Sequence, residues 1–291
     1  MKYETDVVII GSGPVGLFAV FELGLLNLKC HLIDNLDKIG GQCSELYPEK
    51  PIYDIPAYPR ITGQELTNKL MDQIKPFEPT FHLNQQAESI TKVEDQWQIT
   101  TSNNIIINAK CIVIAAGAGS FVPRRPSIEN IEAFENKSVF YSIKEKSKFK
   151  DKKILIAGGG DSALDWTNEL ASLCEVTLMH RRKEFRAAPE SVNKMLDLES
   201  QGKVKFLLGQ ISSIEGNEGK ISKINYTFEE KESFVQVDYL LPFFGLKMEL
   251  GPIANWGLNL EKNLIKVDTE KFETSVPSIF AIGDINTYPG K

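Results

Sequence analysis

The sequence predicts an α/β protein with two three-layer domains, because one pattern of strand, glycine-rich loop, helix and second strand occurs twice. The first copy begins at Val7 and the second at Lys153. In both copies the first strand is a short, apolar run, which is typical of parallel strands buried on both faces of a sheet. The length of 291 residues suits two domains of about 100–200 residues each.

The first copy contains the strand VVII at residues 7–10 and the loop GSGPVG at residues 11–16. Apolar residues at helical spacing predict a helix up to Leu28, and the run CHLI predicts a strand that ends at Asp34. The loop glycines let the backbone approach a pyrophosphate, and a carboxylate after the second strand accepts ribose hydroxyls. A plain strand-to-helix turn is the alternative. The residues predicted to bind this nucleotide are Gly11, Ser12, Gly13, Pro14, Gly16 and Asp34.

The second copy contains a strand at residues 153–157, the loop GGGDSA at 158–163, a helix to about Ser172 and a strand at 176–180. This strand ends in a histidine and two arginines instead of an acid. Guanidinium groups bind an added ribose phosphate in charge-assisted hydrogen bonds, so the pattern favours NADP over NAD. Alternatively, these cations are the solvated start of a helix. The predicted residues are Gly158, Gly160, Asp161, Ser162, Ala163, His180, Arg181, Arg182 and Arg186.

Other strands are predicted between and after these two units. Alternating runs at residues 97–101 and 105–108 flank an Asn-rich turn and predict a hairpin, and residues 111–115 predict a separate buried strand. Three runs in the second half predict a similar meander. These runs are residues 206–208, 224–228 and 234–237.

The chain is predicted to leave its first domain and return to it. A Pro- and Lys-rich stretch at residues 123–153 separates the halves, and the return crossing is expected near residues 243–246. The closing strand of the first domain is expected at residues 278–282, before Gly283 and Asp284. We therefore predict two Rossmann-like three-layer dinucleotide-binding domains, the first discontinuous. Their predicted bounds are 1–117 with 246–291, and 118–245.

Composition excludes several classes of partner. The net charge of −6 argues against a nucleic-acid partner, because phosphate neutralisation needs an excess of Lys and Arg. The four cysteines form no CxxC pair and have no His at metal-ligand spacing, so we expect reduced thiols and no metal. The sequence shows neither a secretion signal nor about 20 consecutive apolar residues, so no membrane segment and a cytoplasmic location are expected.

Six motifs in one order resemble the thioredoxin-reductase-like flavoproteins over nearly the whole chain. They are GSGPVG, GGQC at residues 40–43, AAGAG at 115–119, GGGDSA, HRRKEFRA at 180–187 and AIGD at 281–284. GGQC by itself is more often a plain turn, and its position beside a nucleotide loop is what makes it a candidate. Thioredoxin reductases carry a CxxC before the second glycine loop, where this sequence has VFYSIK at 139–144. The chain therefore resembles the ferredoxin/flavodoxin–NADP reductase branch, as does LYPEKPIYDIP at residues 46–56.

This resemblance implies FAD in the first domain and NADP in the second. It implies that Asp34 binds the adenosine ribose of FAD, that Gln42 and Tyr47 lie by the flavin, and that Ala87 contacts adenine through its backbone. It also implies that Asp284 binds the ribityl–pyrophosphate region and that Phe121 lies beside the isoalloxazine. The remaining expected FAD residues are Gly41, Ala116 and Gly117. Family members continue beyond the GD motif, so we expect either a truncated chain or an incomplete flavin pocket.

The activity implied is hydride transfer between NADPH and FAD, and single-electron transfer between FAD and ferredoxin or flavodoxin. Such chemistry resides in the cofactor, so no catalytic side chain is named. A homodimer and hinges near Gly117 and Gly245 are expected from the family. Two alternatives are a flavin-dependent disulfide reductase using thiols outside this chain and a non-enzymatic nucleotide-binding redox sensor.

Basic residues before the second glycine loop are candidates for the landing site of an acidic partner. That these residues form a solvated linker without a partner is an equally good interpretation. The residues are Arg124, Arg125, Lys144, Lys146, Lys148, Lys150, Lys152 and Lys153.

Overall fold

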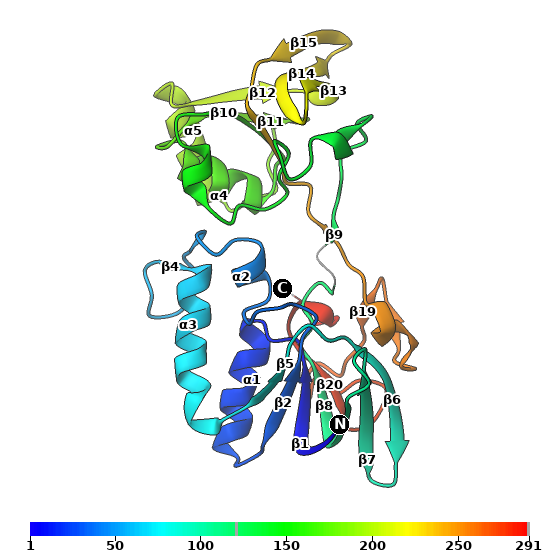
Figure 1. The fold of residues 1–291 in the computed structure, drawn as a ribbon. Helices are drawn as coiled ribbons and strands as arrows, with labels where there is room; N and C mark the ends of the chain where they lie inside the picture. Colours follow the sequence, from blue (N-terminus) through cyan, green and yellow to red (C-terminus); the bar gives the residue numbers. More distant parts are fainter. Residues whose placement is uncertain (120–121, 290–291) are drawn as a thin grey trace. The chain divides into compact units, whose positions relative to one another are not determined.

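The computed structural model describes residues 1–119 and 122–289 and separates two compact units (Figure 1). The first unit contains Met1–Val122 and Lys247–Lys291, and the second contains Pro123–Leu246. The chain thus leaves the first unit once and returns to it. The sequence placed these crossings after residues 117 and 245. Phe121 lies outside the described residues.

The first unit is built on a seven-stranded sheet with the order β5-β2-β1-β8-β7-β6, in which β20 also pairs with β8. The strands β5, β2, β1, β8 and β20 are parallel, and β8, β7 and β6 are antiparallel. The strand bounds are β1 (Lys2–Ile10), β2 (Cys30–Ile33), β5 (Thr80–His82), β6 (Ala87–Val93), β7 (Gln96–Thr101), β8 (Ile106–Ile114) and β20 (Ile279–Ala281).

One predicted division within this sheet is wrong. The two runs at 105–108 and 111–115 belong to one strand, β8, which has different neighbours along its length. Residues 106–109 pair with β7, and residues 112–114 pair with β20. The hydrophobic pattern therefore changes along β8 because its surroundings change, and not because the strand ends. The hairpin of β7 and β8 is confirmed.

Helices cover one face of the first sheet (Figure 1). Helix α1 (Pro14–Leu25) packs beside α3 (Gly63–Ile74), and the fully buried Leu17 lies in the same core cluster as Ile9 and Leu32 of the sheet. The opposite face packs against residues 250–267 through a second apolar cluster. The unit is therefore layered, with the carboxyl ends of its parallel strands left at one edge.

One helix boundary differs from the sequence expectation, and one helix was not expected. Helix α1 ends at Leu25 instead of Leu28, because Asn27 adopts a left-handed conformation with φ of 58°. Helix α3 was not predicted, although Thr62 and Glu65 form a reciprocal capping box at its start. The short elements of this unit are α2 (Gln42–Glu45), β3 (Pro51–Ile52), β4 (Ile61–Thr62), β18 (Leu260–Glu261) and β19 (Leu264–Ile265).

The second unit has a parallel four-stranded sheet with the order β12-β11-β10-β16 and an antiparallel sheet β13-β14-β15. The parallel strands are β10 (Lys153–Ala157), β11 (Glu175–His180), β12 (Val204–Leu208) and β16 (Tyr239–Pro242). The antiparallel strands are β13 (Gln210–Asn217), β14 (Lys220–Phe228) and β15 (Lys231–Val235). The helices are α4 (Asp161–Leu170) and α5 (Pro189–Ser200). The crossings carry β9 (Val122–Pro123) and β17 (Leu246–Lys247).

The predicted meander of this unit is wrong at its first strand. Residues 206–208 belong to β12, which pairs in parallel with β11 in the nucleotide-type sheet. The first strand of the antiparallel sheet is instead β13, which the sequence did not indicate because most of its residues are exposed or half-buried. No helix among the described residues has the length and apolar character needed to cross a membrane.

Candidate nucleotide-binding sites

The first glycine loop follows the carboxyl end of β1, and its three glycines have different surroundings. Gly11 has φ of +105°, and a Cβ there would lie 2.5 Å from the carbonyl oxygen of Ala115. A Cβ on Gly16 would collide with the carbonyl oxygen of Gly11. At Gly13 the nearest atom to an added Cβ is the Cα of Gly41, 3.8 Å away. The fold thus needs the outer two glycines, while the middle one leaves room beside the loop.

Asp34, at the end of β2, is tied to this loop. Its Oδ2 accepts hydrogen bonds of 2.7 Å from both the amide and the hydroxyl of Ser12, and its Oδ1 accepts one of 3.0 Å from the Leu36 amide. A carboxylate has about four acceptor positions. These three bonds leave about one position, on Oδ1, for a ribose hydroxyl, where the sequence suggested that both hydroxyls would bind.

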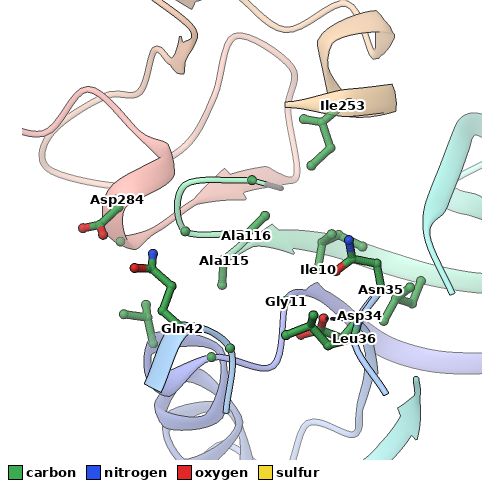
Figure 2. Close-up of a pocket in the computed structure, with 18 of the residues that line it drawn as sticks. Ile10, Gly11, Asp34, Asn35, Leu36, Gln42, Ala115, Ala116, Ile253 and Asp284 are labelled. Atoms are coloured by element: carbon green, nitrogen blue, oxygen red, sulfur yellow. Dashed lines mark hydrogen bonds between the residues drawn. The ribbon is translucent and has the colours of Figure 1, made fainter. Parts of the chain in front are cut away.

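A cavity of about 450 Å³ lies at this edge of the first sheet. Figure 2 shows Gln42 and Asp284 on one side of it, Asp34 and Asn35 on the other, and the glycine loop between them. Ser12 and Gly16 do not line the cavity, because Ser12 is buried against Asp34 and Gly16 packs on Gly11. The predicted residues that do line it are Gly11, Gly13, Pro14, Asp34, Gly41, Gln42, Tyr47, Ala87, Ala116, Gly117 and Asp284.

Much of the cavity wall was not predicted. Residues 249–253 reach it after the return crossing, and no local pattern in the sequence marks them as neighbours of the glycine loop. Gln85 and Gln86 lie directly before β6, so their nearness to Ala87 was the one available signal. The other unpredicted lining residues are Ile10, Val15, Ile33, Asn35, Leu36, Cys43, Ala115, Gly119, Ile282 and Gly283.

Two polar side chains at the Gln42 end of the cavity are kept neutral by burial. The Cys43 sulfur lies 3.9 Å from the Tyr47 hydroxyl. Burial raises the pKa of the Cys43 thiol and also raises the pKa of Tyr47, which lies near the carboxylates of Asp284 and Asp54. Both groups therefore remain protonated near pH 7, and Cys43 does not have the depressed pKa of a reactive thiolate.

The second glycine loop follows the carboxyl end of β10. Gly158 has φ of +154°, and a Cβ there would lie 2.6 Å from the carbonyl oxygen of Phe243. The Arg186 amide donates to the carbonyl oxygen of Gly159 over 2.7 Å, which brings the segment after β11 next to the loop. Asp161 begins α4, but its Oδ1 accepts a hydrogen bond from the Ala188 amide at 2.7 Å. The Asp161 carboxylate is thus used to hold this segment in place.

The basic residues that follow β11 differ in exposure. The His180 ring stacks on Phe185 at 5.5 Å, and its burial lowers its pKa, so the imidazole is neutral at pH 7. Arg181 and Arg182 are exposed, and neither forms an ion pair with any residue that the structure describes. Two guanidinium groups beside a glycine loop can receive a phosphate.

The sequence matches the model of the family "Pyridine nucleotide-disulphide oxidoreductase" over residues 5–291. The chain belongs to this family. A ferredoxin–NADP reductase of Parvibaculum lavamentivorans is 58% identical over 290 residues, which are 99% of this chain and 84% of that protein. A ferredoxin–NADP reductase of Nitrobacter winogradskyi is also 58% identical, over 99% of this chain and 85% of that protein.

Solved structures of oxidoreductases share the fold. Thioredoxin reductase of Lactococcus lactis superposes with a TM-score of 0.85 at 26% identity, over 99% of this chain and 92% of that one. The thioredoxin reductase of T. acidophilum, at 20% identity, gives a TM-score of 0.86 over 98% of this chain and 91% of that one, and shows likeness of fold alone. The predicted fold class, the resemblance without a CxxC and the prediction of an enzyme are confirmed. The family and relatives also support the predicted cofactors, FAD and NADP.

Proposed function

We propose that this protein is a ferredoxin–NADP reductase, which transfers electrons from NADPH, through FAD, to a ferredoxin or a flavodoxin. One observation supports this most strongly. Two glycine loops stand at the carboxyl ends of parallel strands, one beside a cavity with a carboxylate and the other beside exposed guanidiniums. The names of the relatives, at 55–58% identity, point to the same reaction.

The cavity of the first unit has the size of a ligand site and bare backbone at the glycine loop. Its volume of about 450 Å³ is within the range of about 300–1,000 Å³ usual for ligand sites. Gly13 and Gly41 face each other so closely that a Cβ on Gly41 would lie 2.9 Å from the Cα of Gly13. Bare backbone at this point allows a pyrophosphate to approach the amides at the start of α1. In this proposal Asp34 receives the ribose of FAD.

The other end of the cavity is suited to the flavin ring. FAD, when bound, supplies the redox chemistry, since it accepts a hydride and releases electrons singly. Gln42 and Asp284 offer polar groups at that end, and Tyr47 offers a hydroxyl that stays protonated. These residues orient the cofactor and exclude water. None of them is assigned a proton-transfer step.

In the second unit, the glycine loop at residues 158–163 would hold the pyrophosphate of NADPH. Arg181 and Arg182 would bind the ribose phosphate that distinguishes NADPH from NADH, since both are exposed at the end of β11. His180 stays neutral and packs against Gly159, where a Cβ would collide with its ring. We assign His180 the role of shaping this loop.

The basic segment supplies a candidate landing site for an acidic electron acceptor. Lys146 is paired with Glu169 at 2.7 Å, and the Lys148 ammonium lies 3.7 Å from the centre of the Phe140 ring. Lys150 and Lys152 are exposed. We propose that these two lysines, rather than Lys146, attract the acceptor. We further propose that the protein forms a homodimer.

Steady-state reduction of a ferredoxin by the FAD-reconstituted protein tests this function. We expect turnover with NADPH at a kcat/KM at least about tenfold above that with NADH, because one charge-assisted phosphate contact contributes about 1.5–3 kcal/mol. Reduction of thioredoxin or lipoamide, and not of ferredoxin or flavodoxin, would instead identify a disulfide reductase. Protein that binds no FAD under any condition would overturn the proposal in favour of a nucleotide-binding sensor.

A further inference from the structure

Gln85 is a buried polar residue in the cavity wall with half of its amide group unpaired. The residue is only 9% exposed. Its Oε1 accepts a hydrogen bond of 2.8 Å from the hydroxyl of Thr101. Its Nε2 has no hydrogen-bond partner among the residues that the structure describes, although Gln85 lines the cavity. This Nε2 is not one of the fully enclosed unpaired polar atoms, so it stays accessible as a donor to an occupant of the cavity.

The orientation of this amide is set by its neighbours. The Thr101 hydroxyl oxygen accepts a hydrogen bond of 3.2 Å from the Ile105 amide, and its own proton is donated to Gln85. A reversed amide would leave that proton without an acceptor among the described residues. The network therefore places Oε1 toward Thr101 and leaves the NH₂ group as the end that can donate into the cavity.

Gln85 belongs to the Asp34 end of the cavity. The backbone N–H of Gln85 donates to the backbone carbonyl oxygen of Asp34 at 3.0 Å, so the two residues are adjacent in space. Figure 2 shows Asp34 across the glycine loop from Gln42 and Asp284. The wall near Asp34 also contains buried apolar side chains, such as Ile33 and Ile253. Apolar surfaces with a few polar side chains, here Gln85 with Asn35 and Gln86, are suited to a flat heterocycle that has acceptor nitrogens at its edge.

We propose that Gln85 is a specificity-determining residue that donates from Nε2 to an acceptor of the adenosine half of FAD, and that Thr101 is its positioning residue. The inference rests on the proposed function, because it assigns this end of the cavity to adenosine. Adenine carries ring nitrogens that accept hydrogen bonds, and its ribose carries hydroxyl oxygens that do the same. FMN lacks the whole adenosine half, so Gln85 would select the dinucleotide over FMN.

Equilibrium titration of the FAD-free protein with three probes tests this proposal: FAD, FMN and ADP. Gln85→Leu keeps the size of the side chain and removes the donor. We expect it to weaken binding of FAD and of ADP by about tenfold, the equivalent of one hydrogen bond of about 1.4 kcal/mol, and to leave FMN unchanged. Equal weakening of FAD and FMN, or no change in FAD, would overturn the proposal.

Further variants separate recognition from folding. Gln85→Glu keeps the Thr101 contact but replaces the donor with an acceptor beside Asp34, so FAD binding should weaken more than in Gln85→Leu. Thr101→Val should weaken FAD binding and Thr101→Ser should restore it, because the serine hydroxyl can still orient Gln85. Wild-type affinity for FAD in Gln85→Glu would also contradict the proposal.

Gln98→Leu is the matched control. It removes a half-buried glutamine of β7 whose Nε2 donates to Asn108 at 3.4 Å, outside the cavity, and it should leave all three affinities unchanged. If the wild-type protein itself binds no FAD, the proposed function fails. If the wild type binds FAD and the Gln85 variants bind it equally well, only the role of Gln85 fails.

Discussion

Single residues of the first glycine loop have separable roles in folding and in binding. Gly16 is required by the fold, because its Cα packs against the carbonyl of Gly11, whereas an added Cβ at Gly13 meets only Gly41, at 3.8 Å. The sequence predicted that both glycines matter, since the spacing of the loop is visible in it. It did not predict the difference, because the neighbour of Gly13 is Gly41, whose position depends on how residues 40–43 return to the loop.

Gly13→Ala should therefore fold normally and lose FAD. Its φ of −71° is compatible with alanine, but the new methyl group occupies the wall of the cavity where backbone is needed. We expect an unchanged unfolding midpoint with FAD affinity reduced at least about tenfold, or about 1.4 kcal/mol. Gly16→Ala is the contrasting variant and should lose about 2 kcal/mol or more of stability. Tight FAD binding by Gly13→Ala would refute this division of roles.

A second residue-scale feature is the histidine pair His31 and His82. The Nδ1 of His31 lies 3.0 Å from the Nε2 of His82, and both rings contact Tyr3 edge-on. Burial lowers the pKa of both histidines below the ordinary value of 6.5, and for His31 the neighbouring His82 adds to the effect. The folded protein therefore holds both rings neutral where the unfolded chain would be protonated.

The sign of the resulting pH dependence follows from these lowered pKa values. Well above pH 6.5 both histidines are neutral in the folded and in the unfolded protein, and their burial does not lower the free energy of unfolding. As the pH falls through the window between 6.5 and the depressed folded pKa values, the unfolded state binds more protons and the free energy of unfolding decreases. Denaturant titrations at several pH values should show this loss, and replacing both histidines with Gln should flatten it. An equally steep dependence in that variant would assign the effect to other groups.

At the scale of elements, the repeated strand, loop, helix and strand could be predicted because each is set by neighbouring residues. Strand β10 was predicted with its observed bounds, Lys153–Ala157, and β2 ends at Ile33, one residue before the predicted Asp34. The pairing of β8 with β20, and the return of residues 249–253 to the cavity, depend on contacts between distant segments. No local pattern encodes those contacts, so residues 249–253 of the cavity wall were missed.

The end of β11 should set the choice of coenzyme. Replacing both Arg181 and Arg182 with Gln removes two exposed guanidiniums and leaves the backbone of the loop intact. We expect NADP affinity to fall by about 100-fold or more, since two charge-assisted contacts of at least about 1.5 kcal/mol each are lost, while NAD affinity stays the same. Lys183→Gln, on the same exposed segment, is the matched control. Equal losses of affinity for NADP and NAD would show that the arginines do not bind the ribose phosphate.

At the scale of the whole molecule, a chain of net charge −6 is proposed to bind an acidic partner through a basic segment. Lys150→Glu combined with Lys152→Glu should lower the association rate with ferredoxin at least about tenfold at low salt, because steering depends on local charge. The wild-type rate should fall as ionic strength rises. The same replacement at Lys203 and Lys205 is the control. A rate insensitive to salt would remove the steering role of this segment.

The hinges expected near Gly117 and Gly245 remain a prediction. Gly245 has φ of +85°, and an added Cβ there would meet no atom within 4 Å, so the backbone at this crossing is locally unhindered.

Anaerobic mixing of the FAD-loaded protein with NADPH in a stopped-flow spectrophotometer tests whether NADPH reduces the FAD that is bound to the same chain. The visible flavin band should bleach, faster with NADPH than with NADH, and the Arg181 and Arg182 double variant should lose that preference. A protein that holds FAD firmly yet keeps its oxidised spectrum in saturating NADPH would contradict the proposed function.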